Sequence, residues 1–147
     1  MEIERKYLLK SFAVEGRSEL LIQGYLSLDP EIRVRIKAEK AFLTIKSEGN
    51  LSRSEIEVEI PISKAQEMLL LTDKIITKTR YTVDRWEIDV YEGSLAGLLI
   101  AEIELESETE KVEVIPNSII IDREVTCEKA FKNKHLATKG LPKKESL

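Results

Sequence analysis

The chain has 147 residues, and its 34% charged and 42% hydrophobic residues fit a folded domain better than a disordered one. We therefore expect one domain over residues 1–147, with enough apolar side chains to form a core. The 27 acidic and 23 basic residues give a net charge of −4, which argues against non-specific nucleic-acid binding. No apolar run reaches the length of about eighteen residues that a membrane-spanning helix needs.

Alternation of apolar and charged residues predicts a mainly β protein, because a period of two is that of a strand with one face on a core. Turn residues separate eight such segments, which are 2–9, 20–28, 32–38, 41–47, 52–60, 76–82, 86–91 and 99–106. A further short strand at 119–121 is an open alternative. Eight mostly antiparallel strands with few helices predict a sheet closed into a barrel, since closure removes the edge strands.

Two segments are predicted to be helical. The first begins at Ser63, with Gln66 three residues later in the pattern of a capping box. The second covers about 127–137, with Thr126 as its N-cap. The tail from about residue 139 contains glycine, proline and lysines, and we expect it to be flexible.

Charges of both signs occupy one face of nearly every predicted strand. One interpretation is the solvated face of an ordinary antiparallel sheet, and the other is the wet interior of a barrel. Arg33 and Arg35 alternate with aliphatic residues, and arginine binds phosphate oxygens in a bidentate manner. Glu55, Glu57 and Glu59 share one strand face at spacings of about 7 Å, and cations would relieve their repulsion. The pattern favours a site for a highly charged anion together with metal ions.

Short motifs follow one another along most of the chain. The first is Glu2-Ile3-Glu4-Arg5-Lys6. The later ones are 22–26, 33–36, 41–46, 53–61, 78–81, 86–89, 101–105 and 124–126. In order and spacing these motifs resemble those of the CYTH superfamily, the triphosphate tunnel metalloenzymes, whose ExExK signature the first motif matches. The resemblance is to the short bacterial branch and covers residues 1 to about 137. Residues 116–122 lack the tryptophan and glycine of the family pattern, so we expect a local difference near one tunnel mouth.

The resemblance implies an eight-stranded antiparallel barrel around a charged tunnel, and metal-dependent hydrolysis of a triphosphate with Mg²⁺ or Mn²⁺. The bases expected to hold phosphate oxygens are Arg33, Arg35, Lys46, Arg53 and Arg80. The carboxylates expected to hold the metal are Glu2, Glu4, Glu57, Glu102 and Glu104. Carboxylates expected to support these ligands, or to pair with the bases, are Glu55, Glu59, Glu87 and Asp89.

Three further residues are candidates for a catalytic role: Lys6, Tyr25 and Lys78. In related proteins a tyrosine in this setting acts with a tunnel lysine, and either Lys6 or Lys78 can be that lysine here. Neighbouring ammonium groups would lower the pKa of Tyr25 and let it assist proton transfer. Simple packing at one end of the barrel is an equally open role for Tyr25.

The substrate class is a small polyanion, and inorganic tripolyphosphate is the first expectation. A class IV adenylate cyclase, a thiamine triphosphatase and a non-catalytic polyphosphate- or nucleotide-binding module are the alternatives. We expect no nucleic-acid partner and no membrane, and a homodimer stays open. The single cysteine, Cys127, cannot form an intrachain disulfide, and the N-terminus lacks a signal-peptide pattern, which together predict a cytoplasmic protein.

Overall fold

One antiparallel sheet organises the computed structural model, which describes residues 3–47, 54–112 and 114–142. The nine strands in this part of the chain are β1 (Ile3–Phe12), β2 (Arg17–Leu28), β3 (Glu31–Lys37), β4 (Lys40–Lys46), β5 (Glu55–Ile60), β6 (Ile75–Val83), β7 (Trp86–Tyr91), β8 (Leu99–Leu105) and β9 (Ile119–Glu124). Their order across the sheet is β5-β4-β3-β2-β6-β7-β8-β1-β9. Most neighbours follow one another along the chain, as expected for antiparallel strands joined by short turns.

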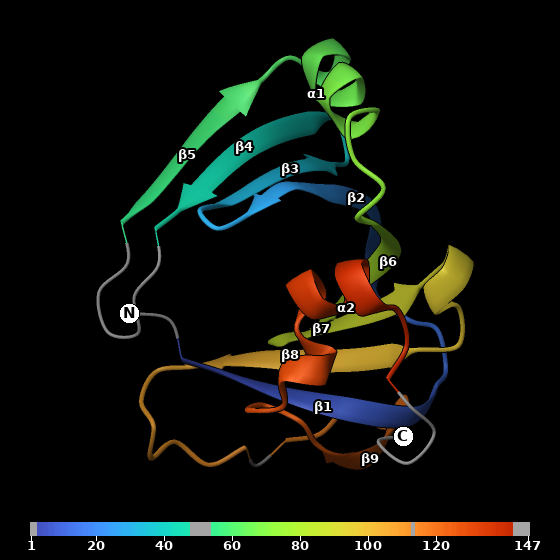
Figure 1. Ribbon diagram of the computed structural model, residues 1–147. Helices are drawn as coiled ribbons and strands as arrows, with labels where there is room; N and C mark the ends of the chain where they lie inside the picture. Colours follow the sequence, from blue (N-terminus) through green and yellow to red (C-terminus); the bar gives the residue numbers. More distant parts are fainter. Residues whose placement is uncertain (1–2, 48–53, 113, 143–147) are drawn as a thin grey trace.

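The sheet bends strongly, so that β5, β4 and β3 lie opposite β8, β1 and β9 across its concave side (Figure 1). The predicted antiparallel β architecture with few helices is confirmed. Two details of that prediction are wrong: there are nine strands, and no hydrogen-bonded ladder closes the described sheet into a barrel. The additional strand is β9, which contains the candidate strand at 119–121. It pairs with the outer edge of β1, which already pairs with β8.

The first helix, α1 (Ile62–Leu69), begins one residue earlier than predicted. Pro61 precedes it with a φ of −60°, and no side chain caps its first turn by a hydrogen bond. The capping box at Ser63 and Gln66 is therefore wrong, because Ser63 already lies inside the helix. The proline supplies the fixed φ that starts the turn.

The second predicted helix is divided into a 3₁₀ turn, η2 (Lys129–Phe131), and α2 (Asn133–Lys139). Thr126 is not its N-cap. Its hydroxyl accepts a hydrogen bond from the backbone N–H of Lys6 at 3.0 Å, which fastens this segment to β1. The predicted flexible tail falls partly on residues 143–147, which lie outside the described residues.

Apolar side chains lie mainly on the convex side of the sheet. Helix α1 covers β2–β4 there, where Val34, Ala41, Ala65 and Leu69 are buried together. A second convex cluster surrounds Trp86. The third cluster differs: it joins Leu8, Tyr91 and Ile100 to Phe131 and Leu136 of the C-terminal segment.

In Figure 1, η2 and α2 lie within the curve of the sheet, next to its inner side. They fill one end of the concave side. A remaining 3₁₀ turn, η1 (Gly93–Leu95), links β7 to β8. Neither helix in the described part of the chain is long or apolar enough to cross a bilayer.

Candidate functional site

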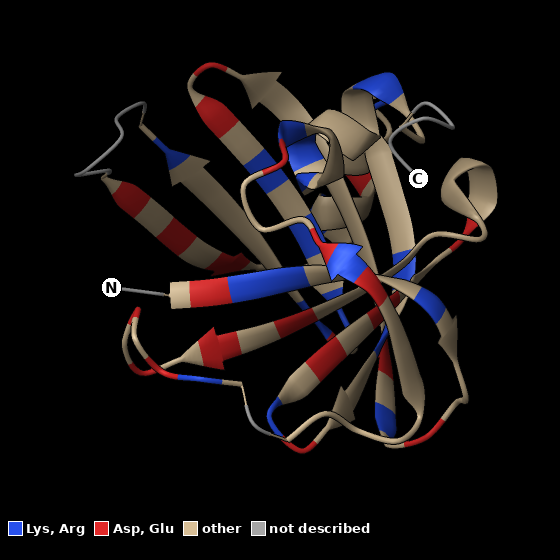
Figure 2. Ribbon diagram, turned by 90° about the horizontal axis from the view of Figure 1, so that it is seen from below, with Lys and Arg blue, Asp and Glu red and all other residues tan. Residues whose placement is uncertain are grey.

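The concave side collects the charged side chains that the alternation predicted. Glu4 lies opposite Glu104, and Lys6 lies opposite Glu102, on the paired strands β1 and β8. Residues directly opposite in a ladder share one face of the sheet, so each pair brings its charges together. Figure 2 shows blue and red bands crossing neighbouring strands at matching positions. The register thus places charges from distant parts of the sequence on one surface.

The strongest contacts of this surface join β6 to β7. Lys78 Nζ lies 2.7 Å from Asp89 Oδ2, and Arg80 donates to both oxygens of Asp89 at 2.8 and 3.0 Å. Arg80 also reaches Glu87 at 3.2 Å. Lys78 and Asp89 are both 0% exposed, so this pair is sealed from water, whereas the Glu87 side chain is 43% exposed. Asp89 and Glu87 therefore pair with bases, one of the two roles predicted for them.

Burial and charge act against each other on these groups. Burial alone would raise the pKa of Asp89, but attraction from Lys78 and hydrogen bonds from Arg80 outweigh it and lower that pKa to about 2. Burial lowers the pKa of Lys78, and Asp89 opposes this only in part. Lys78 is thus held by one carboxylate, that of Asp89, and has no contact with solvent.

The depressed pKa of Asp89 predicts a specific acid sensitivity. A carboxyl whose pKa is lower folded than unfolded stabilises the fold above its unfolded value of about 4, and loses that effect as the pH falls toward 2. We expect the Asp89 carboxyl to account for about 2 kcal/mol of the free energy of unfolding that is lost in acid. Urea unfolding at a series of pH values, for the wild type and Asp89→Asn, measures it. Parallel pH curves for the two proteins would contradict the assignment.

A second cluster lies on β2 and β3. Gln23, which is 0% exposed, accepts a hydrogen bond from Arg35 Nε at 2.9 Å and donates to the Tyr25 hydroxyl at 3.2 Å. Burial, then repulsion from Arg33 and Arg80, lowers the pKa of Arg35 to about 10. Arg35 stays charged at neutral pH, so the cluster carries positive charge that neighbouring carboxylates do not fully balance.

Tyr25 differs from its prediction. It is 3% exposed, and burial raises the pKa of its hydroxyl more than Arg33 and Arg35 lower it. The expected lowered pKa is therefore wrong. Its cationic neighbours are the arginines of β3, Arg33 and Arg35, whose positive charges oppose the effect of burial on this pKa. A neutral hydroxyl in this position is a proton donor, and is not a phenolate base at neutral pH.

The bent sheet has two limbs that face one another, one formed by β5, β4 and β3 and the other by β8, β1 and β9. Lys6 lies on the second limb, in β1. Its Nζ is 3.7 Å from Glu102 Oε1 and donates to the backbone carbonyl of Phe131 at 3.3 Å. The same side chain therefore touches an acidic residue of β8 and the 3₁₀ turn η2. Its exposed fraction is 16%, so it borders the concave side instead of being sealed like Lys78.

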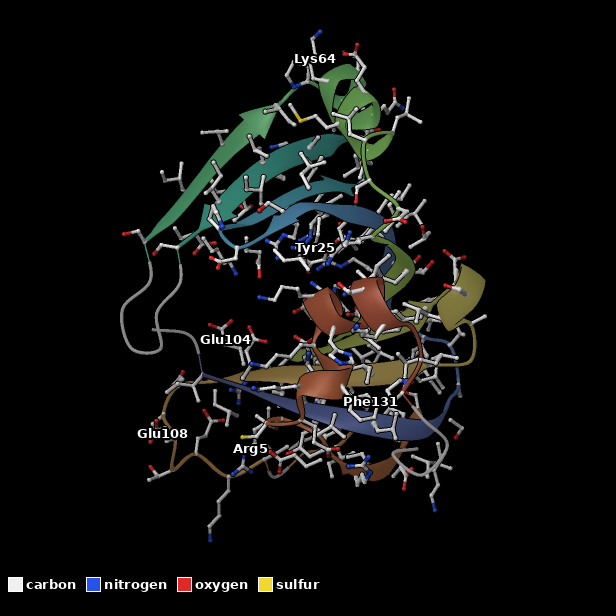
Figure 3. The ribbon with its side chains drawn as sticks, in the orientation of Figure 1. Arg5, Tyr25, Lys64, Glu104, Glu108 and Phe131 are labelled. Carbon is white, nitrogen blue, oxygen red and sulfur yellow. The ribbon has the colours of Figure 1, made fainter. Side chains whose placement is uncertain are left out.

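The candidate metal ligands come from both limbs. Glu4 and Glu104 are exposed on β1 and β8, and Glu57 on β5 accepts a hydrogen bond from Thr44 at 3.0 Å. Tyr25 and Glu104 lie toward one another across the concave side, whereas Arg5 points away from it (Figure 3). Glu55 and Glu59 lie beside Glu57 on the same exposed face of β5. Two predicted site residues, Glu2 and Arg53, lie outside the described residues.

These carboxylates do not form a preassembled metal cage. Within the described ranges, no three His, Cys, Asp or Glu side chains are gathered closely enough to hold an ion by themselves. The donors on both limbs are oxygen atoms, which suit hard divalent cations. Such ions often keep water and bind through a few carboxylates together with substrate phosphates. The donor set therefore fits an ion that binds with its substrate.

Comparisons with known proteins agree with this geometry. The family model of the CYTH domain matches residues 1–126, which include every strand of the sheet. The chain belongs to the CYTH family. The resemblance that the sequence motifs indicated is thereby confirmed.

Two curated relatives of this CYTH domain carry the name inorganic triphosphatase. The protein from Nitrosomonas europaea is 37% identical, over 92% of this chain and 96% of its own length. The protein from Acetivibrio thermocellus is 36% identical, over 92% of each chain. A crystal structure of an inorganic triphosphatase superposes with a TM-score of 0.73 at 33% identity, covering 93% of this chain and 94% of that one.

Several contacts of this CYTH domain were missed by sequence reasoning. Gln23 connects Tyr25 to Arg35, and Tyr91 donates to Asn133 of α2 at 2.7 Å. Gln23 lies within the Ile-Gln-Gly-Tyr-Leu motif, and its position two residues before Tyr25 was a signal that both share a face. Asn133 gave no such signal, because its partner is 42 residues away.

Proposed function

We propose that this CYTH domain hydrolyses inorganic triphosphate with the help of a divalent metal ion. The observation that carries the proposal is the cationic cluster on the concave side, formed by Arg33, Arg35 and Arg80. Arg33 and Arg80 both repel the positive charge of Arg35, and neighbouring carboxylates do not fully balance it. A small polyanion would balance that charge. The two curated relatives named inorganic triphosphatase support the substrate class.

Phosphoryl transfer depends mainly on positioning and on neutralising charge, so most of the proposed roles are electrostatic. Arg33, Arg35 and Lys46 bind phosphate oxygens from β3 and β4, and Arg53 is expected to join them. Arg80 is already bonded to Asp89 and Glu87, which fix the direction of its guanidinium. Lys78, sealed behind Asp89, positions Arg80 and adds positive potential without touching the substrate.

The proposed reaction is attack of water on a terminal phosphorus atom. A new P–O bond forms, the bridging P–O bond breaks, and phosphate and diphosphate are released. The Tyr25 hydroxyl, which stays protonated, and Lys6 Nζ are the two groups proposed to donate a proton to the departing diphosphate. Both border the concave side from opposite limbs.

Glu4, Glu102 and Glu104 on one limb and Glu57 on the other would hold Mg²⁺ or Mn²⁺, and Glu2 is expected to join them. Bound there, such an ion would neutralise phosphate charge and lower the pKa of a coordinated water molecule. Glu55 and Glu59 extend the acidic row on β5. The cytoplasmic location and the homodimer stay predictions.

Phosphate release from tripolyphosphate, ATP and thiamine triphosphate, each with Mg²⁺, Mn²⁺ or a chelator, tests the proposal. We expect the fastest release from tripolyphosphate and none with the chelator. Formation of cyclic AMP and diphosphate from ATP would establish the cyclase alternative instead. Tight binding of all three compounds without any turnover would establish a binding module and overturn the hydrolase proposal.

A further inference from the structure

One buried amide links the arginines of β3 to Tyr25. Gln23 on β2 lies directly opposite Arg35 on β3, and the next pair on the same face is Tyr25 opposite Arg33. The Gln23 side chain is 0% exposed, and both ends of its amide are bonded to residues of the proposed site. A buried polar group with these two partners is well placed to orient them.

The direction of the two hydrogen bonds of Gln23 follows from the chemistry of its partners. Arg35 Nε carries a proton and can only donate, so the amide oxygen of Gln23 faces it at 2.9 Å. The amide nitrogen therefore faces Tyr25, and it donates to the hydroxyl oxygen at 3.2 Å. Tyr25 is the acceptor in this bond, so its own proton points away from Gln23.

Within the described ranges of the chain, that proton has no acceptor. The basic residues beside the hydroxyl, Arg33 and Arg35, have only donors. Glu31 acts on the pKa of Tyr25 through its charge, and its Oε1 lies 3.8 Å from Lys134 Nζ. An oxygen atom of a bound anion is the kind of partner that the Tyr25 proton lacks.

The position of Tyr25 leaves room for such an anion. With Arg33 and Lys46 it lines a pocket of about 520 Å³, and it lies toward Glu104 across the concave side (Figure 3). Because its oxygen accepts from Gln23 on the β2 side, its O–H bond turns toward this space.

The main chain of Tyr25 is held on both sides. Its N–H donates to the carbonyl of Lys74 at 3.0 Å, and its carbonyl accepts from the Thr72 hydroxyl at 2.8 Å. Its side chain is 3% exposed, so packing restricts the ring as well. Rotation of the hydroxyl about the C–O bond is the freedom that remains, and the hydrogen bond from Gln23 restricts it.

We propose that Gln23 is a positioning residue whose amide turns the O–H bond of Tyr25 toward the substrate, so that the proton passes to the departing diphosphate. This inference rests on the proposed function, in which Tyr25 is one of two proton donors. The proton goes from the Tyr25 oxygen to the bridging oxygen as its bond to phosphorus breaks. The attacking water loses one proton overall, which restores the hydroxyl. The amide of Gln23 keeps donating to the phenolate oxygen in between, which stabilises it.

Replacement of Gln23 by glutamate tests this role by reversing the bond at nearly constant size. A carboxylate accepts from Arg35 and also from the Tyr25 hydroxyl, so the proton of Tyr25 would point back to residue 23. We expect kcat for tripolyphosphate to fall about a hundredfold, to the level of Tyr25→Phe. The added negative charge weakens phosphate binding and so raises KM, which is why kcat is compared.

The control is the same substitution in Tyr25→Phe, which has no hydroxyl to orient. If Gln23 acts through that hydroxyl, Gln23→Glu lowers kcat no further in this background. Gln23→Met is the second test variant, because it adds no charge and stays informative where the glutamate variant does not fold. We expect it to lower kcat about tenfold alone and not at all in Tyr25→Phe. Losses that multiply in the double variants would overturn the inference.

Raman spectroscopy tests the hydrogen bond without turnover, because the intensity ratio of the tyrosine ring doublet differs between hydroxyls that accept and hydroxyls that donate. The difference spectrum against Tyr25→Phe isolates this residue among the four tyrosines of the chain. We expect Tyr25 to change from an acceptor toward a donor in Gln23→Glu. The same signal in both proteins would overturn the inference and leave the proposed function standing. Absence of phosphate release from the wild type, with the expected Raman change, would instead overturn the proposed function and leave the hydrogen-bond direction standing.

Discussion

Replacement of Arg35 by alanine lowers kcat/KM for tripolyphosphate by about a hundredfold or more, while the protein stays folded. Arg35 lies in the centre of the cationic cluster, where Arg33 and Arg80 both repel it and only Gln23 bonds its Nε. A bound polyphosphate would relieve that repulsion, so the guanidinium gains most when the substrate is present. Steady-state kinetics at saturating metal measures the effect.

Arg5→Ala is the matched control. Arg5 is an arginine of the same sheet, but it points away from the concave side and lies 3.7 Å from Glu124 (Figure 3). Its replacement is expected to change kcat/KM by less than about twofold, since an exposed ion pair contributes little. Near-normal turnover by Arg35→Ala would mean that the charged face is only a solvated surface. Equal losses in both variants would point to a general effect on the fold.

Replacement of Asp89 by alanine lowers the free energy of unfolding by about 3–5 kcal/mol. The change leaves Lys78 with no carboxylate at its Nζ, and Lys78 is 0% exposed. Arg80 loses its two closest hydrogen bonds as well. An unpaired buried charge is far more costly than the loss of the same pair at a surface.

Glu87→Ala serves as the comparison for that measurement. Glu87 is on the same strand, contacts the same Arg80 at 3.2 Å, and has a side chain that is 43% exposed. Its removal is expected to cost less than about 1 kcal/mol. Urea unfolding followed by the fluorescence of Trp86, the single tryptophan of the chain, measures both variants. Similar losses in the two would show that the Lys78–Asp89 pair is not what stabilises β6 and β7.

Strands were the most predictable part of the fold, because alternation is a local property of the sequence. β7 was predicted with its correct bounds at 86–91, and β3, β4 and β8 within one residue. β9 was only an alternative, since three successive isoleucines at its start show no alternation. The edges of the sheet were not predictable from periodicity, because the edge strand β9 pairs with a strand more than a hundred residues away.

The site was predictable as a set of residues and not as a set of contacts. Alternation placed Lys78, Arg80 and Asp89 on one face, and the register confirms Arg80 opposite Asp89. Which of these charges is sealed from water depends on tertiary packing, in which Lys78 and Asp89 are 0% exposed and Arg80 is 8% exposed. The raised pKa of Tyr25 follows from the same packing, and no local pattern in the sequence reports it.

The acidic row of β5 has a consequence for how copies of this protein behave in solution. β5 pairs with β4 on one side and lies at the end of the described sheet, and its outward residues Ile56 and Val58 are 59% and 46% exposed. An exposed edge with β-branched side chains is a template for aggregation between chains. Glu55, Glu57 and Glu59 would place like charges against one another in any such pairing. Neutralising them therefore removes a barrier to self-association, whatever else it does to ion binding.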